Sequence, residues 1–172
     1  MQLIKKSFVC SLLLAGLSVN TAMAQWTVAG GYTNISEDET GLDLSLSMAS
    51  VGVGYTFETE SGSWSFMPEL RAGVGIGDDT VRDVSVEVNR FLAVSLRANA
   101  HLSDTITLFA QPSYANLDLE ASAFRQSFSE SDTSFGIGAG INAQVSETLS
   151  IEAMYENFDD TDFIGASIRV TY

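Results

Sequence analysis

The last eleven residues of the chain, 162–172, alternate apolar side chains with small or polar ones and end on an aromatic residue. In an extended strand, successive side chains point to opposite faces. One face of this segment carries Ile164, Ala166, Ile168, Val170 and Tyr172. The other face includes Arg169, and its charge argues against an ordinary apolar core on that side. A terminal strand with one apolar face and an aromatic end is what a transmembrane β-barrel requires at the membrane interface.

The start of the chain has the features of an export signal. Lys5 and Lys6 precede an apolar stretch at 8–17, and Ala22-Met23-Ala24 forms a small-x-small cleavage site. The stretch is shorter than the roughly 20 residues of a membrane-spanning helix. The alternative is a retained N-terminal anchor. The sequence therefore predicts a cleaved signal peptide at 1–24, which removes the single cysteine, and one domain at 25–172.

The charge of the predicted mature chain excludes some functions. Cleavage removes both lysines and leaves 6 arginines against 22 acidic residues, a net charge of about −16. Nucleic acid is not an expected partner, because its binding requires a basic surface. No segment of 25–172 approaches the roughly 20 consecutive apolar residues of a spanning helix. A soluble acidic β-sandwich is the main rival to a membrane barrel.

Apolar residues recur at every second position through nearly all of the mature chain. Eight strands are expected near 25–35, 43–58, 64–77, 83–102, 105–121, 131–146, 149–158 and 162–172. Their apolar faces run for about ten residues, which at a tilt near 40° spans the roughly 25 Å of an outer-membrane apolar band. Strands of a soluble sandwich are nearer to about 5–6 residues. The predicted fold is all-β, an eight-stranded antiparallel up-and-down transmembrane β-barrel.

Connection lengths and aromatic residues predict how the barrel is oriented. Both termini and the short turns after the second, fourth and sixth strands are expected in the periplasm. Aromatic residues on the lipid face are expected to form a belt at each interface. The periplasmic belt consists of Trp26, Tyr55, Phe57, Trp64, Phe66 and Tyr172, and the outer belt of Tyr32, Tyr114, Phe135 and Tyr155. The apolar face switches within 42–57, which predicts either a bulge near 47–49 or an outer loop at 42–48.

The signal peptide, the eight alternating strands, the short periplasmic turns and the aromatic end together resemble the small outer-membrane β-barrel family, which includes OmpX and the OmpA membrane domain. The resemblance implies a porin-like protein in the outer membrane of a Gram-negative cell. The implied partners are outer-membrane lipid, lipopolysaccharide and the barrel-assembly machinery, which would recognise the C-terminal strand. Family members usually end on Phe, whereas this chain ends on Tyr172, which keeps the aromatic edge.

Known members of this family include adhesion and serum-resistance factors, membrane anchors, narrow channels and lipid A-modifying enzymes. A structural or surface-interaction role is the expected function of this chain. A narrow passive ion or small-solute pore is the alternative, and a lipid A-modifying enzyme is the third. The chain is expected to be a monomer, without a cofactor and without catalytic or metal-binding residues.

Charged residues on the predicted inner face suggest a lumenal network. They are Glu69, Arg71, Glu87, Arg97, His101, Glu152, Glu156 and Arg169. Buried charges are costly unless they are paired, and an eight-stranded barrel is just wide enough for its side chains to fill. The network can be interpreted either as a polar plug that stabilises the barrel or as a gated ion path. Folding the last two strands about 160–161 places Glu152 opposite Arg169 and predicts an ion pair between them.

Three further patterns have simple interpretations. Glycines at 52, 54, 73, 75, 77, 136, 138 and 140 fall on the inner face and are expected to make room for large lumenal side chains, because no helix follows them to bind a phosphate. His101 lies at the periplasmic end without the convergent partners that serine or zinc chemistry requires. Acidic clusters at 37–39, 78–83 and 159–162 are solvated surface, or bridge Ca²⁺ or Mg²⁺ to lipopolysaccharide.

The outer ends of the fourth and fifth strands extend beyond the roughly ten residues needed to cross the membrane. Arg90 is expected to point outward at the level of the lipopolysaccharide phosphates. Above it, Val84, Val86 and Val88 are expected outward, beside Leu117, Leu119 and Ala121, with Phe124, Arg125 and Phe128 at the tip. An exposed sheet edge can recruit another chain by strand addition. Residues 117–130 are therefore the predicted interaction surface, with a flexible tip that binds nothing as the alternative.

Overall fold

The computed structural model describes residues 24–37, 44–81, 84–123, 126–159 and 161–172. Its strands are β1 (Ala24–Glu37), β2 (Leu44–Glu58), β3 (Trp64–Gly75), β4 (Asp78–Val81), β5 (Val84–His101), β6 (Ile106–Ala123), β7 (Gln126–Gln144), β8 (Leu149–Phe158) and β9 (Thr161–Thr171). The described residues contain no helix long and apolar enough to cross a membrane. The predicted signal segment, apart from Ala24, lies outside the described residues.

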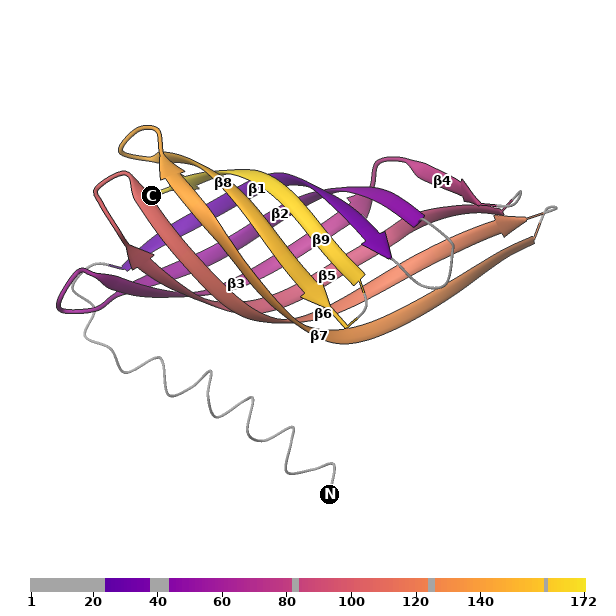
Figure 1. Ribbon diagram of the computed structural model, residues 1–172, viewed down its shortest axis with the longest axis horizontal. Coiled ribbons are helices and arrows are strands. Elements are labelled where there is room, and N and C mark those ends of the chain that lie inside the picture. The colour runs from indigo at the N-terminus through magenta and orange to yellow at the C-terminus, as the bar shows by residue number, and fades with distance from the viewer. Residues whose placement is uncertain (1–23, 38–43, 82–83, 124–125, 160) are drawn as a thin grey trace, which may run out of the picture.

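The strands close into an eight-stranded antiparallel barrel, which confirms the predicted fold (Figure 1). β1 pairs with both β2 and β9, and the β3–β5 pairing completes the ring. β4 continues β3 after a break at Ile76 and Gly77 and pairs with β5 beyond the end of β3. Closure leaves no open edge inside the membrane-spanning part, where an unpaired backbone group would meet lipid instead of water.

Side chains alternate between the two faces of the wall as the sequence predicts. In β3, Trp64 and Leu70 are 51% and 52% exposed, whereas Ser65 and Glu69 between them are 1% and 2% exposed. The apolar side chains point out and many polar ones point in, the reverse of a soluble barrel. This arrangement suits a lipid surround, so the soluble sandwich is wrong.

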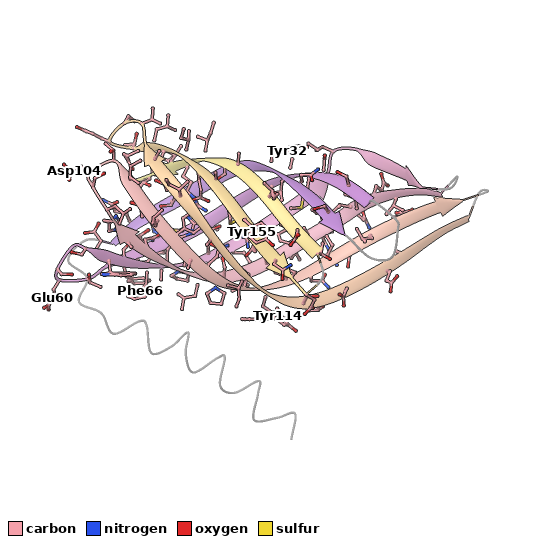
Figure 2. All side chains as sticks on the ribbon, in the orientation of Figure 1. Tyr32, Glu60, Phe66, Asp104, Tyr114 and Tyr155 are labelled. Atoms are coloured by element: carbon pink, nitrogen blue, oxygen red, sulfur yellow. The ribbon has the colours of Figure 1, made fainter. Side chains whose placement is uncertain are left out.

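The two ends of the barrel differ. The start of β1 at Ala24, the C-terminal residue and the turns at 59–63, 102–105 and 145–148 lie at one end, called here the periplasmic end. Glu60 and Asp104 mark it in Figure 2. At the opposite or outer end, β5, β6 and β7 run on past their neighbours, as Figure 1 shows. β7 begins at Gln126, five residues before its predicted start, because this polar stretch pairs with β6 although it lacks apolar alternation.

The predicted irregularity in β2 does not exist. The β1–β2 register runs without a shift from Ala24–Phe57 to Glu37–Leu44, so there is neither a bulge at 47–49 nor an outer loop at 44–48. Residues 42 and 43 lie outside the described residues. The apolar face appears to switch because Leu46 and Met48, each 2% exposed, point into the barrel. The interior at the outer end is therefore apolar.

A bulge does occur in β5, between Val88 and Arg90, and it corrects two predictions. The extra residue reverses the alternation beyond this point. Val88, expected outward, is 3% exposed and Val86 packs against the buried apolar cluster. Glu87, expected in the lumen, is exposed instead. In the strand register it lies opposite Asp78 on β4 and Glu120 on β6.

The register of the last hairpin is two residues from the predicted one. Phe158 pairs with Thr161, so Glu152 lies opposite Ser167 and not opposite Arg169. Two residues connect the strands, and Asp159 has φ 51°, a left-handed conformation that aspartate tolerates better than most residues. This turn is tighter than the prediction assumed.

Most of the inner-face glycines do make room for lumenal side chains. A Cβ at Gly73 would come within 2.6 Å of Met48 Sδ, and one at Gly136 within 2.5 Å of Phe158 Cδ1. A Cβ at Gly140 would overlap Phe109. Two positions are exceptions: a Cβ at Gly77 would have nothing within 4 Å, and the nearest atoms to one at Gly75 are backbone atoms of Val88. The narrow barrel thus accommodates large inward side chains because the positions that face them are glycines, which have no side chain.

The lipid face yields a matched test. Ile168 lies midway along β9 between Ile164, which pairs with Tyr155 of the outer belt, and Tyr172. Ile168→Arg should lower the free energy of unfolding by about 2–4 kcal/mol, whereas Ile164→Arg near the interface should lower it by about 0–1 kcal/mol. Urea titration of the refolded variants in lipid vesicles measures both. Equal costs would contradict the assigned membrane depth.

Candidate functional site

The middle of the barrel interior holds a cluster of four charged side chains. Arg97 donates to both carboxylate oxygens of Glu152, at 2.5 and 2.9 Å. Arg169 joins this pair through its Nε, 2.8 Å from Glu152 Oε2, and its Nη1 lies 2.6 Å from Glu69 Oε2. All four residues are at most 6% exposed. The Glu152–Arg169 ion pair therefore forms along a diagonal between strands, although the predicted register was wrong.

A second cluster lies one layer nearer the outer end. Arg71 binds Glu156 through two hydrogen bonds of 2.8 and 2.9 Å. Glu156, which is 0% exposed, also accepts hydrogen bonds from Gln111 and Ser113. The sequence analysis missed Gln111 and Ser113, although both occupy inner-face positions of β6. The six charged residues of the two clusters carry three positive and three negative charges, so the interior is close to neutral.

Apolar side chains fill the interior between these clusters and the outer end. This apolar plug consists of Ile35, Leu46, Met48, Val88, Phe91, Ala93, Ala115, Phe158 and Phe163. Its aromatic rings pack on one another, with 4.9 Å between the centroids of Phe158 and Phe163 and 5.7 Å between those of Phe91 and Phe163. Arg71 lies over the Phe91 ring and so connects the plug to the charged layer. This plug differs from the polar inner faces predicted from the sequence.

The periplasmic end of the interior is open and polar. A cavity of about 360 Å³ is lined by residues that include Ser65, Arg97, Asn99, His101 and Thr107. His101 is exposed there, with Nε2 3.1 Å from Ser65 Oγ and Nδ1 3.0 Å from Thr107 Oγ1. The structure thus places His101 apart from the ion pairs. The interior is a vestibule that ends at a charged layer and then at the apolar plug.

The predicted belt residues lie on the outside of the wall. Trp26, Trp64 and Tyr172 are 57%, 51% and 77% exposed at the periplasmic end. Trp26, Tyr55 and Phe57 pack edge to face there, with centroid distances of 4.9 and 4.8 Å. Phe66, which is 44% exposed, lies at the same end. Figure 2 shows three of the outer-belt residues, Tyr32, Tyr114 and Tyr155, farther from that end, and Phe135 pairs with Tyr114.

Beyond the outer belt, β5, β6 and β7 form an outer extension that carries a ladder of polar contacts. Arg90, with a side chain 57% exposed, lies 2.6 Å from Asp118 Oδ2. A hydrogen bond from Ser131 and the contact with Arg90 hold the pKa of Asp118 below its usual value. Asn116 donates to Ser131 and Thr133 on β7. This face of the outer extension is polar and cross-linked, and the sequence analysis did not identify Asp118 or Asn116.

One edge of the outer extension has no neighbouring strand among the described residues. β7 pairs with β8 only from Gly136 to Gln144, so 126–135 have a partner on the β6 side alone. The Asp132 carboxylate accepts hydrogen bonds from Thr133 N–H and from the Ser134 hydroxyl and so covers part of this edge. Phe128 pairs with Ala121, while Phe124 and Arg125 lie outside the described residues.

The buried pairs predict strong energetic coupling. Arg71→Met or Glu156→Gln alone should lower the free energy of unfolding by about 3–5 kcal/mol, because either change leaves an unpaired buried charge. The double variant should lose much less than the sum. The exposed Arg90–Asp118 pair is the control and should couple by about 0–1 kcal/mol. A thermodynamic cycle from urea titrations in vesicles that showed additive costs for Arg71 and Glu156 would contradict the network.

Known structures with the same architecture are small outer-membrane barrels. Ail, the attachment invasion locus protein of Yersinia pestis, has a TM-score of 0.62 and 18% identity, with coverage of 87% of this chain and 97% of that chain. Neisserial surface protein A has a TM-score of 0.60 and 8% identity, with coverage of 86% and 96%. The N-terminal β-barrel domain of Pseudomonas aeruginosa OprF has a TM-score of 0.59 and 15% identity, with coverage of 87% of this chain and 100% of that chain. These TM-scores demonstrate a shared fold.

The comparison with curated protein sequences found no match. A family profile described as outer membrane protein beta-barrel domain matches residues 9–172, nearly the whole chain. The lipid-facing apolar wall, the closed strand ring and this match all indicate an outer-membrane barrel. The chain therefore belongs to the outer membrane protein β-barrel family and is an integral protein of the cell outer membrane.

Proposed function

We propose that the chain is a surface-interaction protein of the outer membrane and that the outer extension of β5, β6 and β7 makes the contact. The observation that carries the proposal is the length of these strands, which have 18, 18 and 19 residues, against 10 and 11 for β8 and β9. Crossing the membrane requires only about 9–11 residues. The excess places a rigid sheet above the lipid.

The free edge of β7 gives the contact a mechanism. Strand N–H groups alternate between the two sides of a strand. Because Thr133 N–H is bonded to the Asp132 side chain, we place it on the free side, with the N–H groups of Ser129 and Ser131 on the same side. The exposed Ser129, Glu130 and Ser131 lie beyond the Asp132 cover. A partner strand would add along 126–131 and would receive main-chain hydrogen bonds there.

The charge of the outer extension indicates which partners fit. Ail has been solved in complex with the heparin analogue sucrose octasulfate, a polyanion. In this chain, the described residues of the outer extension include one arginine, Arg90, and five acidic residues, which are Glu87, Asp118, Glu120, Glu130 and Asp132. A polyanion would be repelled from this surface, whereas an extended protein segment without a strong negative charge would not. The proposed partner is therefore a protein strand on a host or neighbouring cell.

A second proposed contact is with lipopolysaccharide at Arg90. Arg90 pairs with Asp118, four residues beyond Tyr114 on β6, which we assign to the level where the outer leaflet carries its phosphates, and Asp118 holds the side chain in place. A guanidinium binds phosphate favourably at such a site. Arg90→Gln should reduce the thermal stabilisation given by added lipopolysaccharide, while Arg90→Lys should retain part of it. Equal stabilisation of both variants and the unchanged protein would contradict this contact.

The interior supports neither a pore nor a catalytic role. The apolar plug and the charged layers occupy the path from the periplasmic vestibule to the outer end. His101 has two hydroxyl groups as its hydrogen-bond partners and lies at the periplasmic end, away from the leaflet that carries lipid A. We therefore propose a non-enzymatic role. Identical lipid A masses from cells that have the protein and cells that lack it would support this role.

Two substitutions at one residue test the strand edge. Ser129→Pro removes the edge N–H of an exposed residue, a change that an edge strand tolerates because that group has no ladder partner. The variant should fold and insert, but adhesion of cells that display it to cultured epithelial cells and to neighbouring bacteria should fall to the level of cells without the protein. Ser129→Ala keeps the N–H group and should adhere as the unchanged protein does.

A shortened variant extends the test. Replacement of 122–127 by Asn-Gly joins the register pair Ala121 and Phe128 through a two-residue hairpin turn. It should also insert and adhere poorly. Undiminished adhesion of the correctly inserted Ser129→Pro variant would reject strand addition, and undiminished adhesion of both variants would reject the outer extension as the contact surface.

A further inference from the structure

Three buried polar atoms in the barrel interior have no hydrogen-bond partner among the described residues. They are Glu69 Oε1, Arg71 Nε and Ser95 Oγ, in residues that are 2%, 9% and 3% exposed. Glu69 and Ser95 are direct partners across β3 and β5. The 3.7 Å between Arg71 Nε and Glu69 Oε1 is too long for a direct N–H···O bond. All three atoms belong to the layer where the two ion-pair clusters meet.

A small cavity borders the same layer. Its volume is about 30 Å³, and its lining includes Glu69, Arg71, Ser50 and Gly52. A Cβ at position 52 would lie 3.3 Å from Arg71 Cγ and 3.4 Å from Glu69 Oε1, so the glycine keeps this space open. One water needs a cavity of about 10–15 Å³ and two to four polar partners.

We propose that this cavity binds an ordered water that bridges Glu69 Oε1 and Arg71 Nε. The carboxylate oxygen accepts a hydrogen bond, and the guanidinium N–H donates one. A cation would be repelled by Arg71 and an anion by Glu69. The site therefore takes a small neutral molecule that both donates and accepts, which is water.

Gln111 joins the two ion-pair clusters, because it accepts a hydrogen bond from Arg97 Nε and donates one to Glu156 Oε1. The bound water adds a second link at the 3.7 Å Glu69–Arg71 contact. On the outer side the cavity is bounded by Met48, Phe91 and Phe163 of the apolar plug. On the other side Arg169 and Glu152 separate it from the vestibule.

Nuclear magnetic resonance of the refolded chain in detergent micelles tests the site through cross-relaxation between water protons and the Arg71 Nε–H. The unchanged protein should show this signal. Gly52→Ala, which places a methyl group against both partners, should lose it. Gly30→Ala is the matched control and should retain the signal, because nothing lies within 4 Å of the added methyl group on this outward-facing residue.

Ser95→Ala tests whether the signal at Arg71 comes from bound water or from the Ser95 hydroxyl proton, which exchanges with water. The signal at Arg71 should persist in this variant, and its loss there would show that the hydroxyl was the source. Absence of the signal in the unchanged protein, or its survival in Gly52→Ala, would also overturn the proposal. If Gly52→Ala fails to fold, the unchanged protein and Ser95→Ala still decide the question.

Discussion

Backbone hydrogen bonding inside a lipid bilayer is the constraint on which the rest of this structure depends. Lipid offers no partner for an N–H or C=O group, so the sheet must close on itself, and the β3–β5 pairing achieves this. Closure fixes an outer face that must be apolar and an inner face that can be polar. The narrow ring then places Arg71, Arg97 and Arg169 close enough to three glutamates to form ion pairs.

The filled interior determines where function can lie. From the periplasmic side, solvent reaches a polar vestibule, and beyond it the charged layer and the apolar plug fill the remaining length of the barrel. A rigid wall around a filled interior leaves the lipid belt, the mouth of the periplasmic vestibule and the outer end available to partners. The outer extension runs past the neighbouring strands at that end and has an acidic, cross-linked face and a free β7 edge.

Much of the fold could be predicted because the alternation of side chains depends only on local sequence. Period two identified every strand of the barrel, and the parity of Arg97, Glu152 and Arg169 placed them inside before any contact was known. Glu87 was misplaced because the bulge at Val88 and Arg90 reverses parity without a local signal. The hairpin register was wrong by two residues because turn length depends on Asp159 adopting a left-handed conformation.

The apolar plug was missed for a different reason. Phe91 and Phe163 have the parity of inward residues, but the prediction was of a polar lumen, while Leu46 and Met48 were assigned to the apolar outer face by a bulge that does not exist. Planar-bilayer conductance of the refolded full-length mature chain tests the resulting account most directly. The filled interior predicts that insertion leaves the current at the level of the empty bilayer. Sustained, stepwise conductance from correctly folded protein would contradict a closed interior and would indicate that the lumen is the functional part of the protein.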